Sequence, residues 1–244
     1  MTARHDSPGA NIELLPQRAP VWMHKLLMST HSGAVDRAVG FNLRRPHEPM
    51  KDRQAAVLVL LSGTETSAEL PNDAAVLLTH RSPTMRSHSG QIAFPGGRMD
   101  ATDANVVDCA LREAWEETGL DRMTVTPVAQ LSEVHIRATG YPVTPVLAHW
   151  HSISPTGVVS PEEADEVINV PMATLIDPAN RFMVRLGQWY GPAFHVNGYV
   201  VWGFTGGILD ALIEQAGWEQ PWDKQTHYDL AESLERSRNN EKKL

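Results

Sequence analysis

The chain of 244 residues lacks the features of a disulfide-stabilised or membrane-spanning protein. Its only cysteine is Cys109, so no intrachain disulfide can form, and a reducing compartment, the cytoplasm, is the expected location. The longest purely apolar run, residues 55–61, is far shorter than the roughly 20 residues of a membrane-spanning helix. Residues 1–10 have no apolar stretch of the kind that a secretory signal needs. We therefore expect a protein whose stability comes from its hydrophobic core, without disulfides, and which has no membrane partner.

Basic charge is also scarce. The chain has 21 Lys and Arg against 29 Asp and Glu, a formal net charge of -8. Because a general nucleic-acid surface would be basic, nucleic acid is not an expected partner. A small anionic ligand is still compatible with this charge, since metal ions or one local basic patch can hold a phosphate. Residues 80–100 contain such a patch, made of Arg81, Arg86 and Arg98 with His80 and His88.

Apolar residues make up 42% of the chain and recur in periodic segments, which excludes intrinsic disorder for most of it. The length admits one large domain or one domain with extensions. A loose leader is expected before residue 20, then a weak helical pattern over 21–40, and a charged end over 223–244 that could form one more helix. Strands are predicted over residues 55–61, 75–79, 123–131, 143–150, 167–170, 182–186 and 195–202, and helices over 102–118 and 206–215.

The predicted helix over 102–118 carries an unusual group of acids. It has Thr102 or Asp103 as its expected N-cap and ends with Arg-Glu-Ala-Trp-Glu-Glu-Thr-Gly-Leu, residues 112–120. At 100° per residue, Glu113, Glu116 and Glu117 share one face, beside an apolar face. Like charges at this spacing repel, and the helix dipole disfavours anions at its C-terminal end. A divalent cation would relieve both effects, because carboxylates are the ligands that Mg²⁺ and Mn²⁺ prefer. A solvated acidic face is the alternative.

This stretch resembles the signature of the Nudix hydrolase family. In that signature a glycine, here Gly97, precedes a loop and a helix with Arg-Glu-x-x-Glu-Glu, which ends at a glycine and an apolar residue. The resemblance implies an α/β fold, an α/β/α sandwich with a mixed, partly curled β-sheet. It also implies that Glu113, Glu116 and Glu117 hold two or three Mg²⁺ or Mn²⁺ ions for the hydrolysis of a diphosphate. Arg112 would orient these glutamates without itself contacting the metal.

The register departs from the general signature at one position. Asp103 stands six residues after Gly97, where the signature has Glu, and Arg112 follows nine residues later instead of eight. A helix-capping role for Asp103 is therefore as open as a metal contact. The longer register and the Asp are similar to those of the coenzyme A pyrophosphatase branch of the family.

Residues 77–97 also resemble the additional motif of that branch. Leu-Leu-Thr-x-Arg-Ser is followed by Arg, Gly and Phe-Pro-Gly-Gly, each after three further residues. Later stretches over 140–146, 161–171 and 202–205 agree, so the resemblance covers about residues 50–215. Within the motif, Arg81 and Arg86 can bind phosphate oxygens in a bidentate way, unless they pair with the surplus carboxylates. The glycines would let backbone approach the substrate, or would simply form turns; these are Gly90, Gly96 and Gly97.

A carboxylate outside the helix is expected to complete the site or to act as the base. The loop over 160–166 is the best source, with Glu162, Glu163 and Glu166 as candidates, and Glu163 best fits the pattern of the branch. Such a loop can also be merely solvated. Cys109 is expected to be a small buried residue without a chemical role.

The resemblance implies a coenzyme A diphosphatase. It would convert coenzyme A or an acyl derivative to 4′-phosphopantetheine, or its acyl form, and adenosine 3′,5′-bisphosphate. The expected organisation is a leader and helical extension (1–40), a Nudix hydrolase domain (41–222) and a charged tail (223–244), as a monomer or homodimer. One alternative is another nucleoside diphosphate substrate, such as a nucleoside triphosphate, ADP-ribose or NADH. Another is a non-catalytic Nudix-fold binding module, which would have no need of three repelling glutamates.

Overall fold

The structure, a computed structural model, describes residues 8–43, 54–135 and 141–242. Its α-helices are α1 (His24–His31), α2 (Ala34–Leu43), α3 (Val106–Thr118), α4 (Met172–Ile176), α5 (Gly203–Ala216) and α6 (Leu230–Glu235). Its strands are β1 (Ala55–Ser62), β2 (Ala75–Arg81), β3 (Ile92–Ala93), β4 (Gly96–Arg98), β5 (Val125–Gln130), β6 (Val134–His135), β7 (Pro142–Trp150), β8 (Ala164–Pro171), β9 (Arg181–Leu186), β10 (Trp189–Val196), β11 (Tyr199–Val201) and β12 (His227–Asp229). Short 3-10 helices cover Pro16–Arg18, Val21–Met23, Arg122–Thr124 and Pro178–Asn180.

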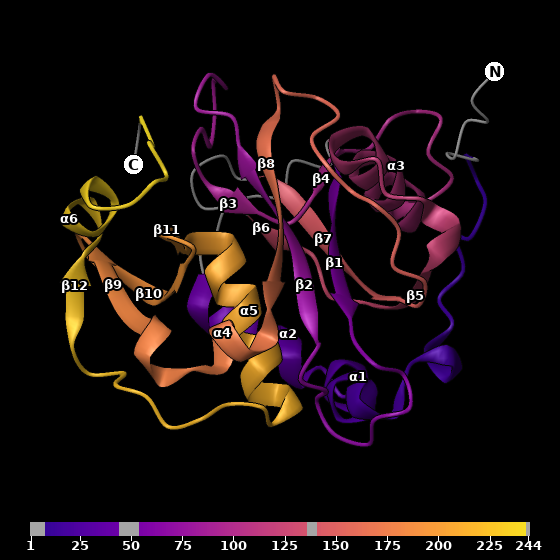
Figure 1. Cartoon of the computed structure of the whole chain (residues 1–244), viewed down its shortest axis with the longest axis horizontal. Helices are drawn as coiled ribbons and strands as arrows, with labels where there is room; N and C mark the ends of the chain where they lie inside the picture. The colour runs from indigo at the N-terminus through magenta and orange to yellow at the C-terminus, as the bar shows by residue number, and fades with distance from the viewer. Residues whose placement is uncertain (1–7, 44–53, 136–140, 243–244) are drawn as a thin grey trace.

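A mixed sheet of eight strands forms the centre of the molecule (Figure 1). Its main path runs β3-β2-β1-β7-β5, with β8 beside β2, β4 beside β1 and β6 beside β7. The pair β1 and β7 is parallel, and the other pairs are antiparallel. Both central strands are almost wholly buried, which explains why they appear in the sequence as continuous apolar runs.

Helices cover both faces of this sheet. Alternate residues of β1 point to opposite sides: Leu58 and Leu60 pack against α3, and Val59 and Leu61 face the core shared with α1, α2 and α5. Figure 1 shows α3 on one side of the sheet and α5 on the other. The predicted α/β/α sandwich is therefore confirmed.

A second sheet was not anticipated. Four strands in the order β11-β10-β9-β12 pack with α6 around a small core of their own. The strand predicted over 195–202 is wrong, because two strands of this sheet meet there in a hairpin. The chain turns at Asn197 and Gly198, both with positive φ, which is the preferred sequence of a two-residue hairpin turn.

The start of α3 differs from the prediction. Asn105, and neither Thr102 nor Asp103, is the N-cap: its side-chain oxygen accepts from the backbone N–H groups of Val107 and Asp108. The end agrees with the prediction, since Gly119 closes the helix in the left-handed conformation at φ 71°.

The leader, expected to be loose, is docked over residues 8–19. The N–H of Gly9 donates to Asp108 on α3, and the amide of Asn11 donates to the carbonyl oxygens of Arg122 and Val125. Because Asp108 also forms a buried ion pair with Arg122, the leader is attached to the first turn of α3. None of the helices in the described ranges has the length and apolarity to cross a membrane.

Candidate active site

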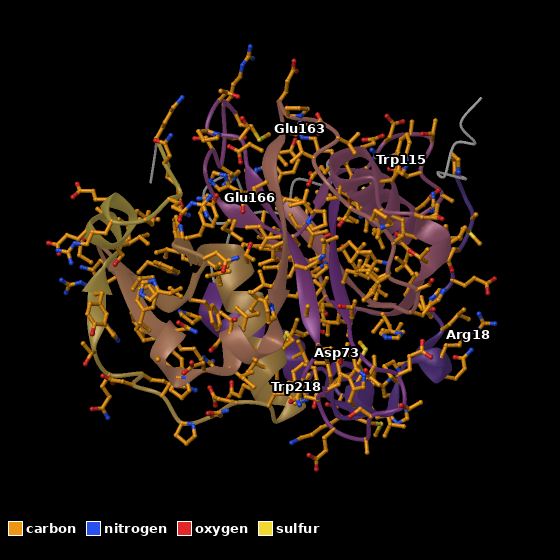
Figure 2. The ribbon with its side chains drawn as sticks, in the orientation of Figure 1. Arg18, Asp73, Trp115, Glu163, Glu166 and Trp218 are labelled. Carbon is orange, nitrogen blue, oxygen red and sulfur yellow. The ribbon has the colours of Figure 1, made fainter. Side chains whose placement is uncertain are left out.

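The three glutamates of α3 differ in their exposure to solvent. The side chain of Glu116 is 41% exposed and that of Glu113 is 14% exposed, whereas Glu117 is buried. In Figure 2, Glu163 lies close to α3 where β8 begins, and Glu166 lies further along β8. The acidic face therefore runs from solvent into the protein and ends at a buried carboxylate.

Arg112 links two of these glutamates to Asp103. Its Nε and Nη2 donate to the two carboxylate oxygens of Asp103 at 2.8 and 2.9 Å. Its Nη1 donates to Glu113 at 2.9 Å and to Glu116 at 3.1 Å. Burial alone would raise the pKa of Asp103, but the hydrogen bonds from Arg112 and the Asp100 backbone hold it below its usual value. Asp103 therefore anchors the arginine and does not cap the helix.

Glu117 lies in an environment that disfavours its charge. Its closest hydrogen-bond donors, the hydroxyl of Thr79 and the N–H of Gly96, are each 3.5 Å away. Burial raises the pKa of Glu117 to about 8; the cation of Arg81 opposes this rise, and Glu113 adds to it. The pKa of Glu113 is raised as well by burial, which Arg112 opposes and the neighbouring acids Glu116 and Glu163 reinforce. Arg112 and Arg81 thus offset only part of the cost of burying these two carboxylates.

The two predicted glycines of the Pro-Gly-Gly turn have different roles. A Cβ on Gly97 would lie 2.4 Å from the carboxylate carbon of Glu113, so this glycine leaves room for that side chain. A Cβ on Gly96 would lie 2.4 Å from the carbonyl oxygen of Ala56 in β1. Gly96 therefore permits the pairing of β4 with β1, and its N–H faces Glu117.

The residues of the additional motif separate into three positions. Arg81, at the end of β2, is close enough to Glu117 to act on its charge, and its buried Nε finds no hydrogen-bond partner among the described residues. Arg86 is exposed on the loop that follows β2. Gly90 contacts the C-terminal segment instead of the glutamates, since a Cβ there would lie 2.2 Å from the carbonyl oxygen of Asn239.

Two of the three acidic-loop candidates can be distinguished by their contacts. The backbone carbonyl of Glu163 accepts from the N–H of Ser82 at 2.9 Å. This bond joins the acidic loop to residues 81–91, which we call the arginine loop because they contain Arg81 and Arg86. The carboxylate of Glu163 acts on the pKa of both Glu113 and Glu117. The carboxylate of Glu166 instead accepts from Tyr199 on β11 and from Arg238 in the C-terminal segment.

The described residues contain no group of three or more His, Cys, Asp or Glu already gathered as a metal site. The donor set nevertheless fits a divalent cation. Burial and the nearby charge of Glu113 raise the pKa of Glu117, and a bound cation would favour its charged form. The glutamates of α3 are therefore the candidates for holding a metal.

These features define an α/β protein with a carboxylate site between a helix and an arginine-bearing loop. The sequence model of the NUDIX domain family matches residues 52–190. The uncharacterized Nudix hydrolase NudL of Klebsiella pneumoniae is 35% identical over 198 residues, covering 72% of this chain and 91% of that protein. NudL of Escherichia coli is 35% identical over 195 residues, with the same coverage. The crystal structure of the Nudix hydrolase RenU from M. smegmatis is similar at a TM-score of 0.47 and 22% identity, covering 70% of this chain and 89% of that chain.

The chain belongs to the Nudix family. It is a Nudix hydrolase, hence an enzyme, and hydrolysis of a nucleoside diphosphate derivative is the class of reaction that this membership supports. Nudix hydrolases generally use divalent metal cations and act on small-molecule diphosphates.

Proposed function

We propose that this enzyme hydrolyses the diphosphate of coenzyme A or acyl-coenzyme A to 4′-phosphopantetheine, or its acyl form, and adenosine 3′,5′-bisphosphate. The observation that carries the proposal is the position of Arg81, which acts on the charge of Glu117. Arg81 belongs to the stretch that resembles the additional motif of the coenzyme A branch, and Glu117 belongs to the general signature. A residue of the additional motif and a residue of the general signature are thus neighbours.

The glutamates Glu113, Glu116 and Glu117 would hold Mg²⁺ or Mn²⁺. When bound, such a cation supplies a Lewis acid for a phosphoryl oxygen and lowers the pKa of a water molecule. Arg112 fixes the direction of Glu113 and Glu116 and is itself fixed by Asp103. Its role is positioning, and the glutamates are its targets.

The remaining residues would handle the substrate and the proton. Arg81 and Arg86 bind diphosphate oxygens, and Gly97 leaves the space that the Glu113 carboxylate occupies. Glu163 accepts the proton of the attacking water as a P–O–P bond breaks, and the leaving phosphate takes the bond electrons. Among the acids of its loop, Glu163 is favoured because it acts on Glu113 and Glu117, whereas Glu166 is engaged elsewhere.

Product analysis tests the proposal. The purified protein would be incubated with Mg²⁺ or Mn²⁺ and with coenzyme A, acetyl-coenzyme A, ADP-ribose, NADH and nucleoside triphosphates, and the products identified by mass spectrometry. Selective release of 4′-phosphopantetheine is expected. Cleavage of another diphosphate would contradict the substrate but keep the metal site, and no cleavage with either metal would contradict the proposal.

A variant of the buried acid separates enzyme from binding module. Glu117→Gln keeps the shape of the side chain and removes a metal ligand, so we expect the loss of most turnover with the fold retained. Asp103 and Arg112 would still hold Glu113 and Glu116 in this variant. Wild-type turnover in Glu117→Gln would exclude Glu117 from the catalytic site.

A further inference from the structure

The C-terminal residues Ser237–Glu241, which we call the C-terminal clamp, lie outside the part that matches the family and yet pack beside the arginine loop. Asn239 is wholly buried. Its side chain accepts from the N–H of Val200 at 2.8 Å and donates to the carbonyl of Val200 at 3.0 Å, in the manner of a paired strand. The clamp is thereby fixed on β11, in the second sheet.

From that anchor the clamp reaches both sides of Arg81. At the residue that precedes Arg81, Nε2 of His80 donates to the backbone carbonyl of Asn239 at 3.0 Å. Across the β2–β3 hairpin, the backbone of Arg81 is bonded at 2.9 Å to Gly90 and to Gln91. Gly90 touches the clamp backbone, and the amide of Gln91 donates to Glu241 at 3.2 Å. Arg81 thus lies between residues that the clamp holds.

Two charged side chains of the clamp, Glu241 and Arg238, make further contacts that hold it to the rest of the protein. The carboxylate of Glu241 accepts from Trp202 and Asn239 as well as from Gln91. Arg238 donates to Glu166 on β8 and lies over the ring of Tyr199. One short segment therefore connects the second sheet, β8 and the arginine loop, which meet at one end of the main sheet (Figure 1).

We propose that the C-terminal clamp is a positioning element that fixes Arg81 for diphosphate binding. The buried Nε of Arg81 has no hydrogen-bond partner among the described residues, and the backbone of Arg81 is held by β8 on one side and, on the other, by Gly90 and Gln91, which the clamp contacts. The positive φ of Gly90, 76°, and its contact with Asn239 give this glycine a role in docking the clamp. The inference rests on the proposed function for the identity of the ligand.

The test compares Asn239→Ala and Glu241→Ala with the matched control Glu235→Ala, which removes an exposed side chain just before the clamp. The dissociation constant for α,β-methylene-ADP, a diphosphate that cannot be hydrolysed at that bond, would be measured by calorimetry with Mg²⁺. We expect it to rise about 10-fold in both clamp variants, as for a weakened charge-assisted hydrogen bond, and to stay unchanged in the control. For the hydrolysed substrate, KM should rise while kcat changes little.

Coupling to Arg81 separates positioning from general stability. If the clamp acts through Arg81, Asn239→Ala should add nothing to the dissociation constant of Arg81→Ala. A lower melting temperature with unchanged dissociation constant and KM would overturn the inference, and so would full additivity with Arg81→Ala. Should Asn239→Ala fail to fold, Gln91→Ala, which removes one clamp contact at the loop, gives the same test.

The binding measurement also keeps the two proposals apart. A wild-type protein that cleaves coenzyme A while its clamp variants keep their KM contradicts the inference alone. A wild-type protein that cleaves nothing but binds the analogue in a clamp-dependent way contradicts the proposed function and keeps the clamp. A protein that neither cleaves nor binds contradicts both.

Discussion

At the scale of single residues, the site depends on how closely the Pro-Gly-Gly turn approaches α3. Gly97 leaves space that the Glu113 carboxylate fills, and the neighbouring Gly96 leaves space that β1 fills. Because a flexible carboxylate can move and a strand backbone cannot, the same added methyl group should have different effects at the two positions.

We expect Gly97→Ala to lose at least about 100-fold in kcat and less than about 1 kcal/mol in the free energy of unfolding, because only Glu113 has to move. Gly96→Ala should instead lose about 2 kcal/mol or more, since its Cβ would collide with the backbone of Ala56 and Val57. Steady-state kinetics and urea unfolding of both variants measure this contrast. Equal losses of stability in the two variants would show that Gly97 is not a site residue.

The base assignment gives a second prediction at this scale. Glu163→Gln should lower kcat by about 100-fold or more, a usual contribution of a general base. Glu162→Gln removes the same charge one position away, on an exposed side chain, and should change kcat less than about 2-fold. The comparison is made at saturating substrate, so that binding does not contribute. A loss confined to Glu162→Gln would transfer the role to that residue.

Residue types and spacing drew attention to the glutamates of α3, but the same pattern also fits a solvated acidic face, and the resemblance to the Nudix signature is what made them candidates for metal binding. The contact of Arg112 with Glu113 and Glu116 agrees with the prediction that the arginine orients them. The place of Gly90 against Asn239 could not be predicted, since the two residues are 149 positions apart and Asn239 lies in a segment without periodicity.

At the scale of secondary-structure elements, α3 begins at Val106, four residues later than the start predicted from the sequence. Thr102, Asp103 and Asn105 are all good N-caps, and propensity does not choose among them. The choice is tertiary: Asp103 is held by Arg112, so the capping position falls to Asn105. The hairpin of β10 and β11, by contrast, has a local signal, since Asn197-Gly198 is a preferred hairpin turn, and the prediction of one continuous strand overlooked it.

Capping makes the start of α3 testable. Asn105→Ala should destabilise the protein by about 1 kcal/mol, the usual cost of removing an N-cap acceptor, with a corresponding drop in melting temperature. Asn105→Asp keeps the acceptor and should recover most of this loss, whereas Thr102→Ala, on an exposed residue, should have almost no effect. If Thr102→Ala proved the more destabilising change, the helix would begin where the sequence pattern placed it.

At the scale of the whole molecule, segments on both sides of the matched family region contact the elements that carry the candidate site. The leader contacts Asp108 at the start of α3, and the C-terminal clamp contacts the loop of Arg81. The helix with the carboxylates and the loop with the cation are thus each attached to one end of the described chain. The site is a product of the full chain, although the residues of its signature are local in sequence.

The buried acid should make the stability of the whole protein depend on pH and metal. Glu117 has a pKa of about 8 in the folded protein and an ordinary value of 4.5 when unfolded. Between these values the folded state holds a proton that the unfolded chain has released, so the free energy of unfolding contributed by Glu117 falls as pH rises through this window.

Without metal, the free energy of unfolding of Glu117→Gln should therefore match that of the wild type near pH 4.5 and exceed it by roughly 2–5 kcal/mol near pH 8. Urea unfolding in EDTA across this range measures the difference, in which the histidines common to both proteins cancel. Added Mg²⁺ should then stabilise the wild type more than the variant near pH 8, because a cation favours the charged carboxylate, and a difference that does not change with pH would show that Glu117 does not hold this proton.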